Sequence, residues 1–125
     1  MNDMQRGEAV MREVLGDDYW EQRVASTTDF NGPLRDLSTT TAYANVWTRE
    51  GLDRKTRSLL CLAMLTALNR PHELRIHLRG AVNNGCTPLE IRETLLHAAL
   101  YCGIPAALDS TRIAQQYLEE RGLID

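Results

Sequence analysis

The eight residues 83–90, NNGCTPLE, place the strongest constraint on the fold, because they combine a signal that ends one helix with a signal that begins another. Gly85 can end a helix because glycine adopts the left-handed backbone conformation without strain. Thr87 is placed to cap the following helix, with Pro88 at its first position and Glu90 completing a capping box. The sequence therefore predicts two helices joined by a short turn.

Comparable signals divide the rest of the C-terminal half into helices. Asp53 is placed to cap a helix over residues 54–69, whose later turns are apolar on every side, which predicts a buried, central position. Pro71 opens one further helix, and Pro105 opens a last amphipathic helix that ends at Gly122. The helix between these two has a predicted core stripe, formed by Ile91, Leu95, Ala98 and Cys102.

Helical spacing of apolar residues extends into the N-terminal part. Residues 3–16 fit a short amphipathic helix that Gly16 stops. Residues 29–51 begin at an Asn-Gly-Pro turn and continue with roughly helical spacing, although three consecutive threonines disfavour a regular helix, because β-branched residues lose rotamer freedom there. No segment alternates like a strand. We therefore predict a single all-α domain over residues 1–125, built around a central antiparallel helix pair.

The composition is that of an ordinary globular protein, with 43% hydrophobic and 25% charged residues. A net charge of −3 gives no broad basic surface, so nucleic acid is not an expected partner. The longest apolar run, LLCLAMLTAL, is too short for a membrane span, and the charged N-terminal stretch does not resemble a signal peptide. We expect a cytoplasmic protein with no membrane partner, whose cysteines, Cys61, Cys86 and Cys102, are free thiols.

One helical face combines residues that are unusual in a packed helix pair. Successive residues of a helix turn by about 100°, so one narrow stripe of the helix that Pro71 opens carries Glu73, His77, Gly80 and Asn84. An imidazole beside a carboxylate can exchange a proton near neutral pH, which suits general acid–base catalysis, and Gly80 leaves room for a ligand or a neighbouring helix. The alternative is an ordinary Glu–His pair on a solvated or subunit face. Spacing alone leaves both interpretations open.

Two longer motifs resemble a known family. The stretches GLDRKTRSL, from residue 51, and ELRIHLRGA, from residue 73, resemble the G-L-D-x-x-T-R-S-L and E-x-x-x-H-x-R-x-A patterns of the carboxymuconolactone decarboxylase family, within a strong resemblance over residues 47–106. The resemblance implies the all-α fold of the alkylhydroperoxidase D-like superfamily, assembly as a homotrimer or homohexamer, and a decarboxylase without a cofactor. The implied reaction converts 4-carboxymuconolactone, a carboxylated lactone of the protocatechuate branch of the β-ketoadipate pathway, to β-ketoadipate enol-lactone and CO₂.

Peroxidase members of the same superfamily carry a Glu followed by a C-x-x-C-x-x-x-H motif. The matching positions here are Ser58, Arg70, Glu73 and His77, so only the histidine is present. Without the paired cysteines a dithiol peroxidase cycle has no electron carrier. The sequence therefore favours the decarboxylase branch.

The implied reaction requires a protein that binds acid groups, stabilises an oxyanion and delivers a proton to carbon. We expect His77 to be the acid, with Glu73 holding its tautomer and keeping it charged. Arg57, or alternatively Arg54, would bind a substrate carboxylate as a bidentate fork, and Gly80 would make the pocket roomier. The other interpretation of Arg57 is a surface or interface salt bridge.

The remaining candidates also have structural alternatives. Trp47 either packs in the core or forms a wall of the substrate pocket. His97 is a further substrate-binding candidate, and its alternative is a hydrogen-bonded core or interface histidine. The three cysteines are expected to be buried small residues or inert thiols. Beyond Glu73 and His77 no ligand spacing is clustered, so no metal site is expected.

The chain departs from the family pattern at two places. Tyr43-Ala44 stands where the family typically has Trp-Gly, and Leu108 stands where it usually has Asn. These departures leave the substrate open. The alternatives are a related decarboxylase, isomerase or cyclase that acts on another lactone or β-keto acid in a biosynthetic pathway, and a non-catalytic helical assembly module.

Overall fold

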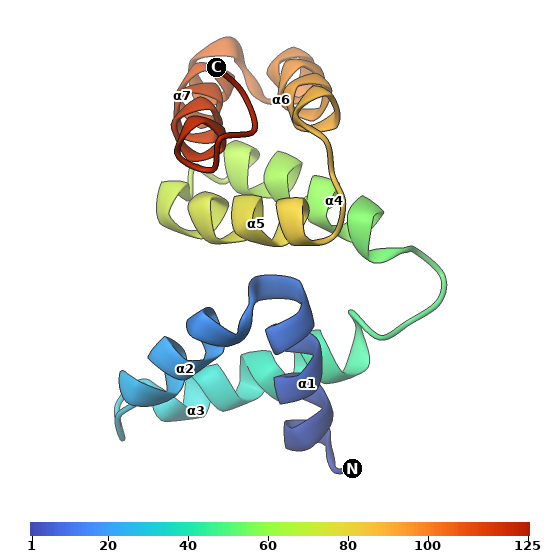
Figure 1. The fold of residues 1–125 in the computed structure, drawn as a ribbon, viewed down its shortest axis with the longest axis vertical. Helices are drawn as coiled ribbons and strands as arrows, with labels where there is room; N and C mark the ends of the chain where they lie inside the picture. Colours follow the sequence, from blue (N-terminus) through green and yellow to red (C-terminus); the bar gives the residue numbers. More distant parts are fainter. The chain divides into compact units, whose positions relative to one another are not determined.

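The computed structural model describes residues 1–125, and all of its regular structure is helical (Figure 1), which confirms the predicted all-α class. No helix is both long enough and apolar enough to cross a bilayer. The elements follow in the order α1 (Asp3–Leu15), α2 (Asp17–Ala25), α3 (Gly32–Leu37), the π-helix η1 (Ser38–Tyr43), α4 (Arg54–Ala67), α5 (Pro71–Asn83), α6 (Pro88–Cys102) and α7 (Ile104–Glu120). The chain forms two compact units, Met1–Arg54 and Lys55–Asp125. Our prediction of a single domain over residues 1–125 stays a prediction.

In the N-terminal unit, α1 is fixed at both ends and lies against η1. A capping box joins Asn2 and Gln5 at its start. Gly16 ends the helix, and this end is the one that the sequence predicts. Gly7 lies so close to η1 that a Cβ atom on it would come within 2.3 Å of the Thr39 carbonyl oxygen. The absence of a side chain at Gly7 therefore permits this contact. The buried apolar residues of α1 are Val10, Met11, Val14 and Leu15.

The sequence did not predict helix α2. Only Trp20 of this helix is buried, so its apolar residues lack the periodicity that reveals a helix. A reciprocal contact joins α2 to α3: the Arg23 guanidinium donates to the Arg35 carbonyl at 3.0 Å, and the Arg35 guanidinium donates to the Arg23 carbonyl at 2.7 Å. These bonds from side chains to backbone carbonyls join α2 to α3 with little apolar burial.

The three consecutive threonines lie in the π-helix η1, whose turns are wider than those of an α-helix. Thr39 and Thr40 donate from their hydroxyls to the carbonyls of Arg35 and Asp36, four residues earlier, at 2.9 Å and 2.8 Å. Such side-chain bonds compete with the regular backbone ladder of a helix. The predicted weakness of a regular helix in this segment is confirmed, because the chain stays helical but does not stay α-helical.

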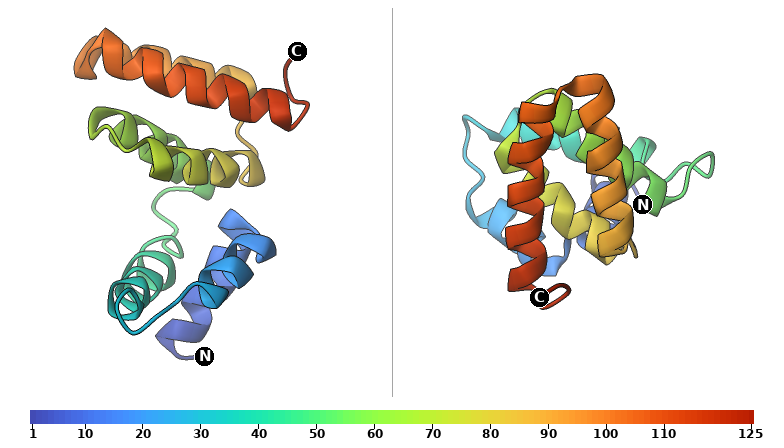
Figure 2. Two further views of the ribbon diagram at one scale, coloured as in Figure 1. Left: turned by 90° about the vertical axis from the view of Figure 1, so that its left-hand side faces the viewer. Right: turned by 90° about the horizontal axis from the view of Figure 1, so that it is seen from above.

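The C-terminal unit consists of two layers, each an antiparallel helix pair (Figures 1 and 2). The helices α4 and α5 form one layer, and α6 and α7 form the other. The turn between the layers follows the sequence signals: Gly85 has a φ of +89°, and Thr87 and Glu90 form a reciprocal capping box. The core between the layers consists of Leu62, Leu74, Leu78, Ala81, Cys86, Ile91, Leu95, Ala114, Tyr117 and Leu118.

Two details of the predicted core are wrong. Helix α4 is buried on one side only, along Ser58, Leu62 and Thr66, whereas its other apolar side chains include the exposed Leu60 and Met64. An all-round apolar helix therefore has an uncovered face in this chain. Cys102, predicted on the core stripe of α6, is exposed, because it stands in the last turn, beyond the buried Ala98.

Substitution of Gly7 by alanine is expected to destabilise the N-terminal unit by about 1–3 kcal/mol, because the new methyl group would meet the backbone carbonyl of Thr39, which cannot rotate away. Both tryptophans, Trp20 and Trp47, lie in this unit, so tryptophan fluorescence in a urea titration reports its unfolding. Gly51→Ala is the matched control, because a Cβ atom there meets nothing within 4 Å. Equal unfolding midpoints for the two variants would contradict the close contact.

Candidate functional site

The predicted stripe on α5 runs from solvent into the interior of the C-terminal unit. Glu73 stands exposed in the first turn, His77 is half-buried one turn later, and Gly80 is buried. At the end of the stripe, the Asn84 side-chain amide donates to the Ser58 hydroxyl of α4 at 2.9 Å. Leu74, Leu78 and Ala81, which lie about 100° round α5 from the stripe, are held in the core, so the helix cannot rotate to hide or expose the stripe as a whole.

Burial is the larger of two opposing influences on the pKa of His77. Desolvation lowers the pKa of His77, and the nearby Glu73 carboxylate raises it by less than burial lowers it. Glu73 therefore favours the charged imidazole, as expected, but more weakly than burial disfavours it, and its catalytic role stays a prediction. The physical reason is that the Glu73 carboxylate is exposed, and solvent screens its charge, whereas the imidazole has lost much of its own hydration.

The two candidate arginines at the start of α4 lie in different surroundings. Arg54 forms an ion pair with Glu13 of α1 inside the N-terminal unit. Arg57 is half-buried, and its Nε atom is buried. Beside them, Lys55 forms an ion pair of 2.7 Å with Glu90, which joins the first turns of α4 and α6. Arg54 is thus engaged in an ion pair, and the choice between Arg57 and Arg54 as the group that binds a substrate carboxylate stays a prediction.

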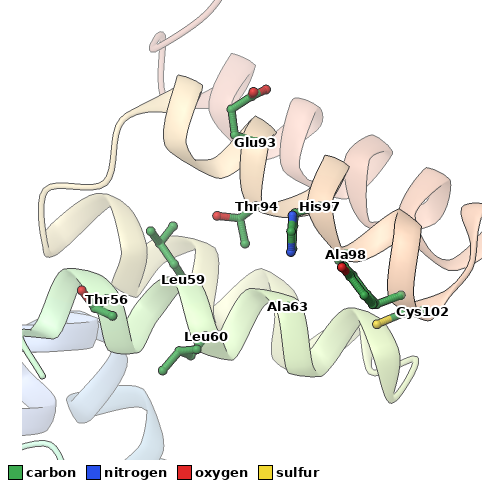
Figure 3. Close-up of a pocket in the computed structure, with 10 residues that line it drawn as sticks. Thr56, Leu59, Leu60, Ala63, Glu93, Thr94, His97, Ala98 and Cys102 are labelled. Atoms are coloured by element: carbon green, nitrogen blue, oxygen red, sulfur yellow. The ribbon is translucent and has the colours of Figure 1, made fainter.

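His97 lies in a separate hollow between α4 and α6 (Figure 3). The hollow has a volume of about 480 Å³, and neither Glu73 nor His77 lines it. His97 is exposed, and its ring lies 5.2 Å from the Tyr101 ring. The core alternative for His97 is therefore wrong, because the solvent side of α6 carries it. Apolar residues form most of the wall, namely Leu59, Leu60, Ala63 and Ala98.

Two further residues from the sequence analysis, Trp47 and Leu108, each have distinct surroundings in the structure. Trp47 belongs to the N-terminal unit, where it is buried and stacks on Tyr43, with ring centroids 5.7 Å apart and planes within 4°. This is the packing alternative for Trp47. Leu108 lines a hollow between α6 and α7 whose walls include neither His77 nor Glu73. The structure thus brings Glu73 and His77 together but places His97 and Leu108 elsewhere.

The three cysteines are free and differ in exposure. Burial raises the pKa of the Cys61 thiol, which keeps it protonated and less reactive. Cys86 is buried and its thiol lies 3.5 Å from the Lys55 carbonyl oxygen. Cys102 is exposed, so the expectation of a buried residue is wrong for it. The structure contains no group of three or more His, Cys, Asp or Glu side chains placed to hold a metal ion.

Ser58 is the residue that sequence reasoning undervalued. It is fully buried, it receives the Asn84 hydrogen bond, and it occupies the position at which the peroxidase pattern has a glutamate. Ser58 and Thr66 are the two buried polar residues of α4, on the same side of the helix as Leu62. The sequence signal that could have identified Ser58 was its correspondence to the glutamate of the peroxidase pattern. By itself, that correspondence only distinguishes two branches of the superfamily.

Comparison with known proteins gives a consistent result. The model of the carboxymuconolactone decarboxylase family matches residues 34–116. A nitrosuccinic acid decarboxylase of Metarhizium robertsii is 44% identical over 114 residues, which cover 91% of this chain and 80% of that protein. A 4-carboxymuconolactone decarboxylase of Acinetobacter baylyi is 40% identical over 126 residues, which cover 98% of this chain and 94% of that protein.

The pKa of His77 is expected to lie below the unperturbed value of about 6.5 in an imidazole NMR titration. Glu73→Gln should lower the pKa of His77 further, because it removes the charge that partly offsets burial. Glu119→Gln, on the exposed side of α7, is the matched control and should leave it unchanged. If the titration midpoint of His77 is the same in the Glu73→Gln variant as in the wild type, the side chains of Glu73 and His77 are not coupled.

The same shift predicts the sign of a pH effect on stability. Because the folded pKa of His77 lies below the unfolded one, the unfolded chain binds this proton more readily. The contribution to stability is fully present above about pH 6.5 and is lost as the pH falls from there through the folded pKa. His77→Asn should remove this contribution from the acid side of the stability curve.

Proposed function

Because the chain belongs to the carboxymuconolactone decarboxylase family, we propose that it removes CO₂ from a small carboxylated lactone, with His77 as the proton donor. The observation that carries the proposal is the Glu73–His77 pair on one face of α5. We place 4-carboxymuconolactone first as substrate, because the relative named for it aligns with nearly the whole chain.

The two acids named in the relatives share the chemistry that decarboxylation needs. In each acid the carboxylate stands on a carbon that can delocalise the electron pair left behind by CO₂. In nitrosuccinic acid the pair moves into the nitro group. In 4-carboxymuconolactone it moves through the unsaturated ring to the carbonyl oxygen of the lactone. When CO₂ leaves, the electrons of the broken C–C bond form a nitronate or a furanolate. A proton then adds to carbon to give the product. Stabilisation of the oxyanion and delivery of that proton are the tasks left to the protein.

His77 suits proton delivery even though burial lowers its pKa in the free protein. A substrate with carboxylate groups brings negative charge next to the imidazole, and a nearby opposite charge favours the protonated form. His77 would therefore take up a proton from solvent as the substrate binds and pass it to carbon after CO₂ has left. Glu73 would assist by supporting the charged imidazolium and by orienting the ring. The net proton uptake matches the loss of a carboxylate as CO₂.

Arg57 is proposed to hold a second carboxylate of the substrate. Its guanidinium offers paired donors that match the geometry of a carboxylate, and its partial burial would strengthen the contact. Ser58, the next residue, is bonded to Asn84 and thus keeps the start of α4 in register with the end of α5. Gly80 is proposed to leave space for the substrate between Glu73–His77 and that bond.

Nitrosuccinic acid is the second candidate substrate, and the 44% identical relative is the observation that favours it. The purified protein should be assayed with both acids at equal concentration, with CO₂ release as the readout. A larger kcat/KM for 4-carboxymuconolactone supports the first candidate, and a larger value for nitrosuccinic acid supports the second. Binding of either acid without release of CO₂ would instead identify a non-catalytic module.

His77→Asn is expected to lower kcat by about 10²–10⁴-fold, which is the usual cost of losing a positioned general acid. Glu73→Gln should lower it less, because the amide still accepts a hydrogen bond and only the charge is lost. His72→Asn is the matched control. This histidine is exposed and precedes His77 by five residues on α5, and its loss should leave kcat unchanged. Turnover by His77→Asn at the wild-type rate would mean that the pair is structural.

The reaction in D₂O tests the same role through the product. The proton donor fixes the face of the carbon that receives hydrogen, so the wild-type protein should introduce one deuterium stereospecifically. His77→Asn should erode this selectivity, because water would deliver the deuterium from either face. Retained selectivity in the His77→Asn product would assign the proton to another group.

The pH profile should separate the free and substrate-bound states of His77. The protonated imidazole is the acid, so activity falls as the pH rises through its pKa. The fall of kcat/KM, which reports the free protein, is expected at a lower pH than the fall of kcat, which reports the complex with anionic substrate. Steady-state rates between about pH 5 and 9 measure both limbs. Coincident limbs would show that the substrate does not raise the pKa of His77.

A further inference from the structure

One hydrogen bond of the C-terminal unit anchors the end of the candidate stripe to a fully buried side chain. The Asn84 amide donates through Nδ2 to the Ser58 hydroxyl at 2.9 Å, and Ser58 is 0% exposed. The bond joins the start of α4 to the end of α5, and these helices lie side by side (Figure 1). Asn84 itself is half-buried, so the bond holds an amide in a fixed position on the stripe that carries Glu73 and His77.

A second buried pair in the same unit shows the form of a purely structural bond between helices. The Thr66 hydroxyl of α4 bonds to the Ser110 hydroxyl of α7 at 2.8 Å, and both residues are buried, at 2% and 5% exposed. The Ser58–Asn84 pair differs because one member reaches the border with solvent. A primary amide has two N–H donors and an oxygen, of which one N–H contacts Ser58. The second N–H is therefore available to a ligand.

The proposed decarboxylation needs such a donor, and the inference below rests on that proposed function. Loss of CO₂ leaves negative charge on an oxygen of the nitronate or the furanolate, and this oxygen stands two bonds from the carbon that receives the proton. A group that binds the oxyanion must therefore lie near His77. On the stripe, Glu73 has the wrong charge and Gly80 has no side chain, which leaves the Asn84 amide. Asparagine side chains are among the groups that form oxyanion holes.

We propose that Asn84 donates its second amide N–H to the oxyanion of the intermediate, and that Ser58 is the positioning residue that aims it. Asn84 follows His77 by seven residues, which is about 10 Å along α5 at roughly 1.5 Å per residue. Two contacts of about 3 Å leave roughly 4 Å between the carbon and the oxygen, and small rotations of the two side chains bring this to the length of two bonds. The substrate then lies over Gly80.

The helix ends around Asn84 also permit an anion. The last carbonyls of α5 carry partial negative charge, which alone would disfavour an oxyanion there. The bond to Ser58 brings the start of α4 beside them, and the N–H groups at a helix start carry the opposite partial charge. The two helix ends therefore offset one another. The amide then stabilises charge that forms only after CO₂ has left, so its effect falls on kcat rather than on KM.

Asn84→Asp separates this role from a structural one. The aspartate can accept a hydrogen bond from the Ser58 hydroxyl, so the bond between α4 and α5 is kept, but the new side chain has no N–H donor. We expect kcat for CO₂ release to fall by about 10²–10³-fold, with a urea midpoint close to that of the wild type in circular dichroism. Ser58→Ala should lower kcat by about 10–100-fold at unchanged KM, because the amide remains but is no longer aimed.

Ser110→Ala is the matched control, because it removes a buried bond of the same kind away from the stripe. It should lower the urea midpoint about as much as Ser58→Ala does, and it should leave kcat at the wild-type value. Wild-type kcat in the Asn84→Asp variant overturns the inference. An equal loss of kcat in Ser58→Ala and Ser110→Ala overturns it as well, because the Ser58 bond would then act through stability alone.

Binding of the intermediate tests the inference without turnover. The nitronate of 3-nitropropanoic acid is the species that nitrosuccinic acid forms when CO₂ leaves, and the His77→Asn protein lacks the proposed donor that would protonate it. In this background, Asn84→Ala should raise the nitronate Kd by about 10²-fold. A wild-type protein that releases CO₂ from neither acid overturns the proposed function. An equal nitronate Kd with and without the Asn84 amide, or no nitronate binding, overturns the role of Asn84.

Discussion

The rotation of α5 about its own axis is the constraint on which the candidate site depends. Leu74, Leu78 and Ala81 are buried in a core shared with α4, α6 and α7, so one side of the helix is fixed inward. Successive residues turn by about 100°, and the stripe of Glu73 and His77 therefore stands at the border between core and solvent. The half-burial of His77, and with it the lowered pKa, follows from packing that involves neither side chain. The surroundings of His77 are thus set by hydrophobic contacts on the adjacent side of the helix.

Much of the C-terminal unit was predictable because its signals are local. Pro71, Gly85 and the Thr87–Glu90 capping box act through their own backbone geometry, and each does what its residue type dictates. The family, too, was predictable, because its motifs are short and lie on these same helices. Helix α2 was missed for the opposite reason: its place depends on contacts with α3 and on one buried tryptophan, which no local periodicity reveals.

The errors within the candidate site have a common physical cause. Residue spacing gives the direction of a side chain but not how much of it is covered. Spacing placed Glu73 next to His77, whereas the balance between desolvation and attraction depends on the different burial of the two groups. In the same way, spacing predicted core positions for all the apolar residues of α4 and for His97 of α6, whereas Leu60, Met64 and His97 are exposed in the structure. Which surfaces a chain leaves open is a property of the whole arrangement.

The π-helix η1 has a consequence for how this chain tolerates changes of length. A π-turn holds one residue more than an α-turn, so the segment Ser38–Tyr43 stores an extra residue of register. Removal of a single residue there would let the segment return to an α-helix, and the residues on its C-terminal side would keep their orientation, because the wide turn already accommodates the extra residue. Tyr43 and Trp47, which stack at 5.7 Å at the end of this turn and beyond it, would then keep their buried positions. In a regular α-helix the same deletion would rotate every later residue by about 100°, so this stretch tolerates the loss of one residue better than the other helices do.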